Sequence, residues 1–222
     1  MKQCVLHEPS GYKMMKNDII FEYLNRLFPN AHCELEYKKD YELLIAIILS
    51  AQCTDKRVNM VTSKMFSKYQ TLAELNELPL SVLEKEIHSL GLYKNKAINI
   101  KKTVQILIEK YNGTVPKEKK DLLTLPGVGV KTANVFRAEW YKEPEIAVDT
   151  HVSRVAKRLN YASELDDVNV IESKLRQALK KGDYIKAHHL FIHFGRYFCK
   201  AINPECEKCE LKKYCRLHND KF

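Results

Sequence analysis

The sequence predicts an all-α protein, and two observations support this fold class. Glycine and proline number only seven each among 222 residues, so few positions interrupt regular structure. Apolar residues recur at spacings of three and four along most of the chain, as in Val58, Val61 and Met65, and that period is typical of amphipathic helices. About ten helices of ordinary length fit between the breakers. The length suits one large domain or two small ones.

The beginning of the chain lacks this period. We expect residues 1–15 to be a flexible N-terminal extension and the first helix to start in the periodic stretch from Asn17 to Phe28. The longest apolar run, Leu43 to Ala51, is far shorter than the roughly 20 residues that a bilayer span needs. No signal segment opens the sequence. We therefore expect a cytoplasmic protein with no membrane partner.

The charge balance points to a polyanionic partner. Lysine and arginine number 37 against 28 aspartate and glutamate residues, which gives a net charge of +9. Such a balance favours nucleic acid, although many basic proteins bind nothing anionic. Four of the seven cysteines fall between positions 199 and 215 and the others are scattered. That distribution is a poor disulfide framework and favours a reducing compartment.

A glycine-rich turn joins two predicted helices at residues 122–133, LLTLPGVGVKTA. Glycines at Gly127 and Gly129 let the main chain approach a ligand closely. The second helix should begin near Gly129, where free backbone N–H groups can hold a phosphate oxygen. The turn can therefore grip DNA without reading its sequence. The alternative is an ordinary corner between two helices.

Lys131 occupies an unusual place for a structural lysine. It follows Gly129 in the first turn of the predicted helix, where the positive end of the helix dipole disfavours a cation. The same field favours the neutral amine, which is the form that can attack a sugar carbon and form a Schiff base. A solvated lysine or a plain phosphate contact is the alternative.

Asp149 follows the short apolar segment Ile146 to Val148 and precedes another amphipathic helix. It is well placed to cap that helix, whose buried stripe we expect to contain Val152, Val155, Ala156 and Leu159. A capping carboxylate needs no catalytic role. A catalytic role requires Lys131 and Asp149 to face one cleft, which the sequence does not show.

The tail contains the spacing Cys199-x6-Cys206-x2-Cys209-x5-Cys215. Four thiolates this close together can surround one metal centre, and ligand count alone favours zinc. Basic residues lie among the cysteines and can contact phosphates or stay solvated. These residues are Lys200, Lys208, Lys212, Lys213 and Arg216.

Taken together, these stretches resemble the endonuclease III family of base-excision repair glycosylases, within the helix-hairpin-helix glycosylase superfamily. The similarity runs from about Asp18 to Arg216. Its carriers are LSAQCTD at 49–55, GLYKNKA at 91–97, LPGVGVKTANV at 125–135, IAVDTHVSRV at 146–155, HHLFIHFGRYFC at 188–199 and the cysteine loop.

The resemblance implies two helical domains on either side of a DNA-binding groove. A six-helix barrel with the helix-hairpin-helix would span residues 33–143. Residues 16–32 and 144–222 would form the second domain, in which the four cysteines hold a [4Fe-4S] cluster. The expected partner is double-stranded DNA with a damaged base or an abasic site. The protein would act as a monomer, associated with the nucleoid when on DNA, and flip the damaged nucleotide out of the duplex.

By position in the motifs, Lys131 matches the lysine that attacks the sugar and Asp149 matches the carboxylate that assists departure of the base. A lysine here implies the bifunctional branch of the family, which also cleaves the abasic site by β-elimination. The implied substrates are oxidised pyrimidines such as thymine glycol. Alkylated or mismatched bases are the alternative, as is a DNA-binding relative without catalysis.

The resemblance also assigns residues that contact DNA. Gln52 and Leu92 match the wedge residues that fill the gap in the base stack. Without this resemblance, the local sequence predicts that Leu92 lies in the core and that Gln52 is a polar residue at the end of a helix. The hairpin residues expected at the DNA are Leu125, Gly127, Gly129, Val130 and Thr132.

Three features depart from the family's pattern. Val130 stands where a basic residue is common, and Leu123 replaces a frequent acidic residue. The segment from Phe136 to Tyr141, FRAEWY, is bulkier and more charged than the usual small-residue helix. We expect this segment to alter the pocket lining or the helix packing.

Overall fold

Residues 16–219 of the computed structural model are described, and they form helices without any strand, which confirms the all-α prediction. The expected extension, residues 1–15, lies outside the described part. The α-helices are α1 (Lys16–Leu27), α2 (Asp40–Leu49), α3 (Asp55–Lys68), α4 (Leu72–Glu77), α5 (Leu80–Ile87), α6 (Tyr93–Tyr111), α7 (Lys119–Leu122), α8 (Val130–Trp140), α9 (Thr150–Arg158), α10 (Val168–Ala178), α11 (Tyr184–His193) and α12 (Arg216–Asn219). Shorter turns are η1 (Lys181–Asp183), η2 (Phe194–Phe198), η3 (Cys206–Lys208) and η4 (Lys212–Tyr214), of which η2 is a π-helical turn that prolongs α11.

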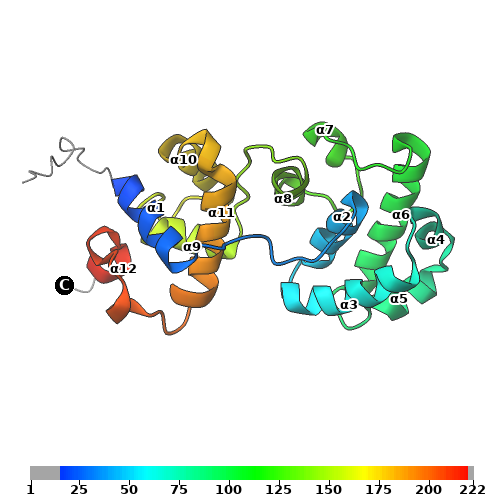
Figure 1. Cartoon of the computed structure of the whole chain (residues 1–222), viewed down its shortest axis with the longest axis horizontal. Helices are drawn as coiled ribbons and strands as arrows, with labels where there is room; N and C mark the ends of the chain where they lie inside the picture. Colours follow the sequence, from blue (N-terminus) through cyan, green and yellow to red (C-terminus); the bar gives the residue numbers. More distant parts are fainter. Residues whose placement is uncertain (1–15, 220–222) are drawn as a thin grey trace, which may run out of the picture.

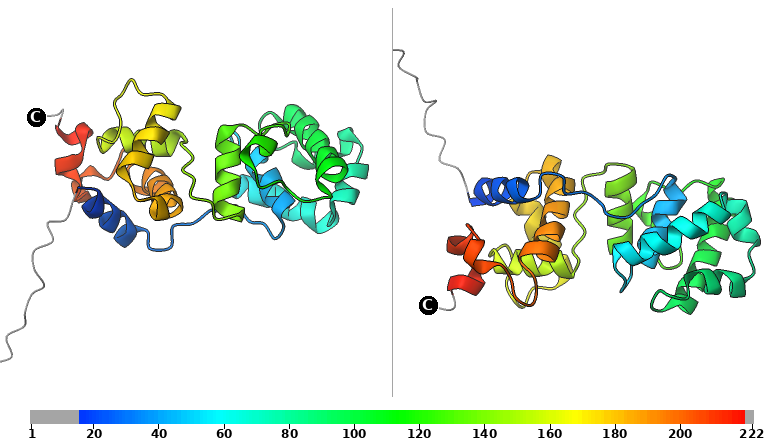
Figure 2. Two further views of the ribbon diagram at one scale, coloured as in Figure 1. Left: turned by 90° about the horizontal axis from the view of Figure 1, so that it is seen from above. Right: turned by 60° about the horizontal axis from the view of Figure 1, so that its bottom comes forward.

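The buried apolar residues form two separate clusters. The first runs from Leu35 to Phe136, and the second joins residues 20–24 to residues 146–211. Figure 1 shows α2 to α8 gathered at one end of the long axis, and α1 with α9 to α12 at the other. The two views in Figure 2 show the same separation, with the chain crossing once after α1 and again after α8. The first helix therefore packs with the C-terminal half of the chain.

Helix α2 is the centre of the first cluster. Its residues from Leu43 to Leu49, which make up most of the longest apolar run, are all buried. A helix that is apolar on every face is stable when neighbouring elements cover all of its faces. Those neighbours include α3, α6 and α8. No helix in residues 16–219 is both long enough and apolar enough to cross a membrane.

Helix α9 is central to the second cluster. Val152, Val155, Ala156 and Leu159 are all buried there, which confirms the stripe predicted from their spacing. The helix packs against α11 and its π-helical extension. Gly195 of that extension lies so close that an added Cβ would be 3.0 Å from the His151 Cβ. The π-helical extension of α11 therefore packs closely against the start of α9, next to Asp149.

Candidate active site and nucleic-acid interface

Lys131 and Asp149 line one cavity of about 70 Å³. The cavity also has lining residues from both apolar clusters, including Ile47 of α2 and Ile192 of α11. The structure therefore brings together two residues that are separated in the sequence by most of α8 and by the connection to α9. A hollow of about 580 Å³ on another surface is lined by residues such as Lys38 and Phe66 and includes neither of the two.

Lys131 is the second residue of α8, whose N-cap is Gly129. Its side chain is exposed at the cavity mouth. The backbone N–H groups of Val130, Lys131 and Thr132 have no hydrogen-bond partner within residues 16–219. Unpaired N–H groups of this kind leave a positive end that can accept an anionic group. The helix start predicted near Gly129 is thus confirmed.

Asp149 is the N-cap of α9. Its Oδ1 accepts hydrogen bonds from the backbone N–H groups of His151 at 2.9 Å and Val152 at 2.8 Å. Within the described residues, Oδ2 accepts none. The helix-cap interpretation is therefore correct, and it leaves one carboxylate oxygen free to act in the cavity.

The two glycines of the hairpin between α7 and α8 have different reasons to be glycine. Gly127 has φ +80°, and an added Cβ would lie 3.1 Å from the Cβ of Asn99 on α6. The backbone conformation and the close packing of the turn therefore both require glycine at this position. Gly129 has φ −93° and open space where a Cβ would lie. The hydroxyl of Thr103 on α6 donates to the Pro126 carbonyl at 2.9 Å. Helix α6 therefore supports the turn from beneath.

The other hairpin residues expected at the DNA differ in exposure. Val130 is exposed, Thr132 is half-buried and Leu125 is buried in the first apolar cluster. The carbonyl of Leu125 accepts a hydrogen bond from the Val128 N–H at 3.1 Å. Leu125 therefore lies at the base of the turn, with its side chain in the core and its carbonyl bonded to the backbone of the turn.

Gln52 and Leu92 both lie on the surface in left-handed backbone conformations. Their φ values are +56° and +59°, which side chains with a Cβ rarely adopt. Leu92 is 56% exposed, so the prediction from local sequence alone that it lies in the core is wrong. Gln52 lies in the loop between α2 and α3, and Ser50 and Asp55 at the two ends of that loop line the cavity. Unfavourable backbone of this kind often marks functional positions.

A buried polar cluster borders the cavity, and the sequence interpretation assigned it no role. Nε2 of His189 on α11 lies 2.5 Å from a carboxylate oxygen of Glu139 on α8. Burial raises the pKa of Glu139, but the hydrogen bond and charge of His189 outweigh burial, so the pKa lies below its ordinary value. Burial lowers the pKa of the adjacent His188, and a charge on His189 lowers it further. The adjacent histidines at the start of the 188–199 motif are the only feature of the sequence that could have indicated this cluster.

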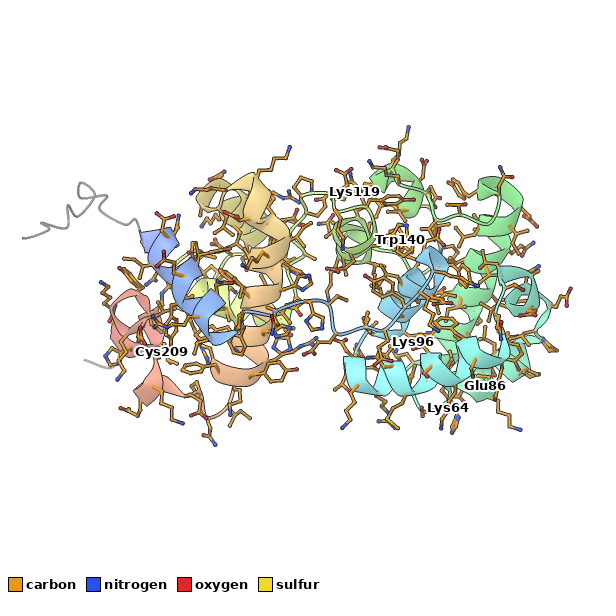
Figure 3. All side chains as sticks on the ribbon, viewed as in Figure 1. Lys64, Glu86, Lys96, Lys119, Trp140 and Cys209 are labelled. Atoms are coloured by element: carbon orange, nitrogen blue, oxygen red, sulfur yellow. The ribbon has the colours of Figure 1, made fainter. Side chains whose placement is uncertain are left out.

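None of the residues from Phe136 to Tyr141 lines the cavity, and their contacts are with neighbouring helices and loops. Phe136 is fully buried in the first cluster. The ring of Trp140 lies 6.1 Å from that of Tyr37, and Figure 3 labels Trp140 on α8. Glu139 makes the contact to α11 described above. The bulky and charged side chains of this segment therefore make contacts around α8.

The four cysteines of the tail line one small cavity of about 30 Å³ next to Leu159, Phe194 and Phe198. Figure 3 labels Cys209 near α12 at the end of the molecule. A guanidinium nitrogen of Arg158 on α9 donates to the Cys199 sulfur at 3.2 Å and to the Lys200 carbonyl at 2.8 Å. The described part contains no group of three or more His, Cys, Asp or Glu side chains set to hold a single metal ion.

The basic residues among these cysteines are largely paired with acidic ones. Glu205 lies 3.5 Å from the ammonium of Lys200 and 3.1 Å from that of Lys208. Lys212 is 3.8 Å from Glu207, and Arg216 is 3.5 Å from Glu164. The loop therefore presents less free positive charge than its sequence indicates.

Comparisons with known proteins agree with this arrangement. Residues 45–181 match the family described as "HhH-GPD superfamily base excision DNA repair protein". The chain is 45% identical to an endonuclease III from Bacillus subtilis (strain 168), over 90% of this chain and 91% of that protein. An endonuclease III from Rickettsia felis is 44% identical, over 90% and 93%. The structure of a trapped endonuclease III–DNA covalent intermediate matches with a TM-score of 0.89 and 46% identity, covering 94% of this chain and 99% of that one.

A helical protein with this hairpin beside a cavity shared by a lysine and a carboxylate has the architecture of a base-excision glycosylase. The chain belongs to the HhH-GPD superfamily of base excision DNA repair proteins and, within it, to the endonuclease III family. It is accordingly a DNA glycosylase with abasic-site lyase activity.

Proposed function

We propose that this protein removes oxidised pyrimidines, such as thymine glycol, from double-stranded DNA and then cleaves the abasic site, with Lys131 as nucleophile and Asp149 as its catalytic partner. The observation that carries the proposal is the single cavity lined by both residues. Nucleophile and assisting group must reach one sugar, so a shared cavity is the geometric condition for this chemistry. The net charge of +9 suits a DNA substrate.

The reaction proceeds in two parts. The neutral amine of Lys131 attacks the anomeric carbon, and the base departs with the bonding electron pair and accepts a proton. Asp149, through its free Oδ2, assists this departure. The nitrogen loses a proton, and the bond between the anomeric carbon and the ring oxygen breaks as that oxygen takes up a proton, which opens the sugar and gives the imine. The imine acidifies the neighbouring C–H, and loss of that proton expels the 3′ phosphate by β-elimination. A relative of the same fold was trapped as a covalent intermediate with DNA, which supports the covalent route.

The hairpin and the two wedge residues would hold the DNA. Free N–H groups at the start of α8 suit a backbone phosphate, and the open space at Gly129 permits close approach. Gln52 and Leu92, both exposed, would fill the gap that the flipped nucleotide leaves. Extracting a nucleotide costs unstacking energy, so side chains that replace the lost stacking favour the flipped state.

We further propose the two-domain division expected from the resemblance, with residues 33–143 as the barrel domain and residues 16–32 with 144–222 as the cluster domain. The separate apolar clusters support it. Cys199, Cys206, Cys209 and Cys215 would hold a [4Fe-4S] cluster, and their common cavity fits this assignment. Such a cluster would crosslink the tail, and Arg158 would neutralise part of its charge.

Borohydride trapping tests the nucleophile. Reduction in the presence of a thymine-glycol duplex should give a covalent protein–DNA adduct, because borohydride converts the imine to a stable amine. Lys131→Gln should abolish the adduct because the amide cannot form an imine. Lys64→Gln is the matched control, since Lys64 is exposed on α3 outside the cavity, and should trap as well as the wild type.

Survival of the adduct in Lys131→Gln would refute the nucleophile assignment. Base-release assays with the wild type on duplexes carrying thymine glycol, an alkylated purine or a mismatched thymine test the substrate class. Release of only the alkylated or mismatched base would refute the oxidised-pyrimidine proposal. Lesion binding without release of any base would refute the proposed catalysis.

Iron analysis tests the metal centre. Purified protein should contain about four irons per chain and absorb broadly near ~400 nm. Cys206→Ser should lose most of the iron and absorbance, whereas Cys33→Ser should retain both because Cys33 lies in the other cavity. A colourless protein with one zinc per chain would contradict the assignment.

A further inference from the structure

We propose that Lys96 is a positioning residue that holds both wedge residues in place. This inference rests on the proposed role of Gln52 and Leu92. Two segments are involved: the Gln52 loop, residues 50–54 between α2 and α3, and the Leu92 turn, residues 88–92 between α5 and α6. They are far apart in the sequence, and Lys96 in the first turn of α6 bonds to both.

Lys96 is almost completely buried, with 4% of its surface exposed. Its ammonium group contacts the Leu49 carbonyl at 2.9 Å, the Ala51 carbonyl at 2.7 Å and the Cys53 sulfur at 3.4 Å. An ammonium has three N–H donors, so all three have acceptors. Lys96 forms no salt bridge with a carboxylate within the part of the chain that the structure describes. A buried cation satisfied only by neutral groups is costly, which argues for a positional purpose.

The three acceptors surround Gln52. Leu49 is the last residue of α2, where the negative end of the helix dipole favours a cation. Ala51 precedes Gln52 and Cys53 follows it, so the ammonium holds both chain neighbours of the proposed wedge residue. Figure 3 labels Lys96 where α2 approaches α3.

The backbone of the same residue holds Leu92. The Lys96 N–H donates to the Leu92 carbonyl at 3.1 Å, which makes Leu92 the N-cap of α6. Leu92 has no side-chain cap of its own. Gln52 and Leu92 both have positive φ, a conformation that the surrounding structure must enforce. Lys96 therefore connects the two left-handed positions through one side chain and one backbone bond.

The test compares Lys96→Met with Lys101→Met. Lys101 is also on α6, and its ammonium also bonds to backbone carbonyls, that of Asn76 in the last turn of α4 and that of Leu78 just after α4. Two substrates are used: a thymine-glycol duplex for base release in a single turnover, and a single-stranded abasic oligonucleotide for borohydride trapping. The single strand has no opposing stack to fill, so trapping on it reports Lys131 chemistry without the wedge.

We expect Lys96→Met to lower duplex base release by about tenfold to hundredfold, since small misplacements of positioning groups have effects of this size. Single-strand trapping should stay within about twofold, and Lys101→Met should change neither rate by more than that. Equal losses on both substrates, or wild-type release by Lys96→Met, would overturn the proposal.

A double-mutant cycle separates positioning from general destabilisation. Lys96→Met removes the side-chain bonds around Gln52 and keeps the backbone bond to Leu92. Gln52→Ala should therefore slow duplex base release strongly in the wild type and little in Lys96→Met, because a misplaced Gln52 contributes less to the flipped state. Full additivity of the two effects would overturn the proposal. If circular dichroism shows that Lys96→Met does not fold, the comparison is made between Lys96→Gln and Lys101→Gln instead. Glutamine keeps two N–H donors, and the same rate changes are expected to distinguish these two variants.

Failure of the proposed function gives a different result. If wild-type protein forms no adduct with either DNA, the assignment of Lys131 fails and the Lys96 proposal falls with it. If the wild type traps DNA normally and only the Lys96 comparisons fail, the assignment of Lys131 stands without the positioning role.

Discussion

The two carboxylate oxygens of Asp149 have different tasks in this structure. Oδ1 caps α9 through two backbone N–H groups, whereas Oδ2 has no hydrogen-bond partner in residues 16–219. Capping fixes the orientation of the carboxylate, because the bonds to His151 and Val152 come from backbone that is itself helical. A structural role and a catalytic role are therefore compatible in one side chain.

We predict that Asp149→Asn lowers base release by about 10²- to 10⁴-fold, the usual contribution of a group that assists proton transfer. Asparagine also caps helices well, so the free energy of unfolding should change by less than about 0.5 kcal/mol. Asp167→Asn is the matched control, because Asp167 caps α10 through the same pattern of two N–H groups. Single-turnover rates and urea unfolding measure the two effects. Equal activities of the two variants would refute the catalytic role.

The polar contacts of α8 show what local patterns omit. Glu139 lies in a helix and His189 in a motif that carries the family resemblance, and neither pattern points to the other residue. Their contact at 2.5 Å exists because α8 and α11 approach each other beside the cavity. Residue type and spacing within one element do not encode the approach of two elements that belong to different apolar clusters.

At the scale of secondary structure, three residues of helix α6 support two functional segments, the Gln52 loop and the hairpin. Lys96 bonds to residues around the Gln52 loop, Asn99 packs beneath Gly127 and Thr103 bonds to Pro126. These residues lie about one turn apart along the same helix, so their relative positions are fixed by helix geometry. The hairpin and the wedge residues are therefore held by one rigid element.

The two hairpin glycines give a prediction at this scale. Gly127→Ala should lower the free energy of unfolding by about 1–2 kcal/mol, because alanine is disfavoured at φ +80° and its Cβ would crowd Asn99. Gly129→Ala should lower it by a smaller amount, about 0.5–1 kcal/mol, because alanine is a poorer N-cap than glycine but meets no neighbouring atom there. It should nevertheless weaken duplex DNA binding if phosphate approaches that position.

Thermal unfolding and a salt-controlled binding assay distinguish these effects. The hairpin assignment would be contradicted if Gly129→Ala bound duplex DNA as tightly as the wild type. The packing explanation for Gly127 would be contradicted if both alanine variants unfolded at the same temperature.

At the scale of the whole molecule, Arg196 connects the two halves. It lies on the extension of α11, and its guanidinium contacts Glu34 in the connection after α1 at 2.5 Å and Asp55 of α3 at 2.7 Å. Both Asp55 and Arg196 line the cavity with Lys131. The ion pairs thus hold together the two sides of the cavity.

We predict that Arg196→Met lowers the free energy of unfolding by about 1–3 kcal/mol, a value between those for exposed and for fully buried ion pairs. The loss arises because two partly buried carboxylates would be left close together without a cation. Arg26→Met is the control, since its ion pair with Glu210 is well exposed and should contribute less than about 1 kcal/mol. Denaturant unfolding at moderate salt measures both. Equal effects of the two variants would contradict this account.

The sequence by itself determined the helical class, the helix starts at Gly129 and Asp149, the buried stripe of α9 and the cysteine grouping, because each depends on local spacing or on capping chemistry. It also carried the family resemblance, through motifs spread along most of the chain. Local spacing alone predicts Leu92 in the core, and this is wrong. The sequence pattern of an apolar residue in a turn is the same whether its side chain is buried or exposed.

Only the tertiary structure decided which of these residues meet. The shared cavity of Lys131 and Asp149, the Glu139–His189 contact and the Lys96 bonds to the Gln52 loop all join elements that are not adjacent in the chain. Such contacts depend on how the two apolar clusters pack and on the left-handed backbone that α6 enforces. The physical reason is that side-chain periodicity specifies which face of an element is buried, whereas the neighbour that covers this face is selected by packing of the whole chain.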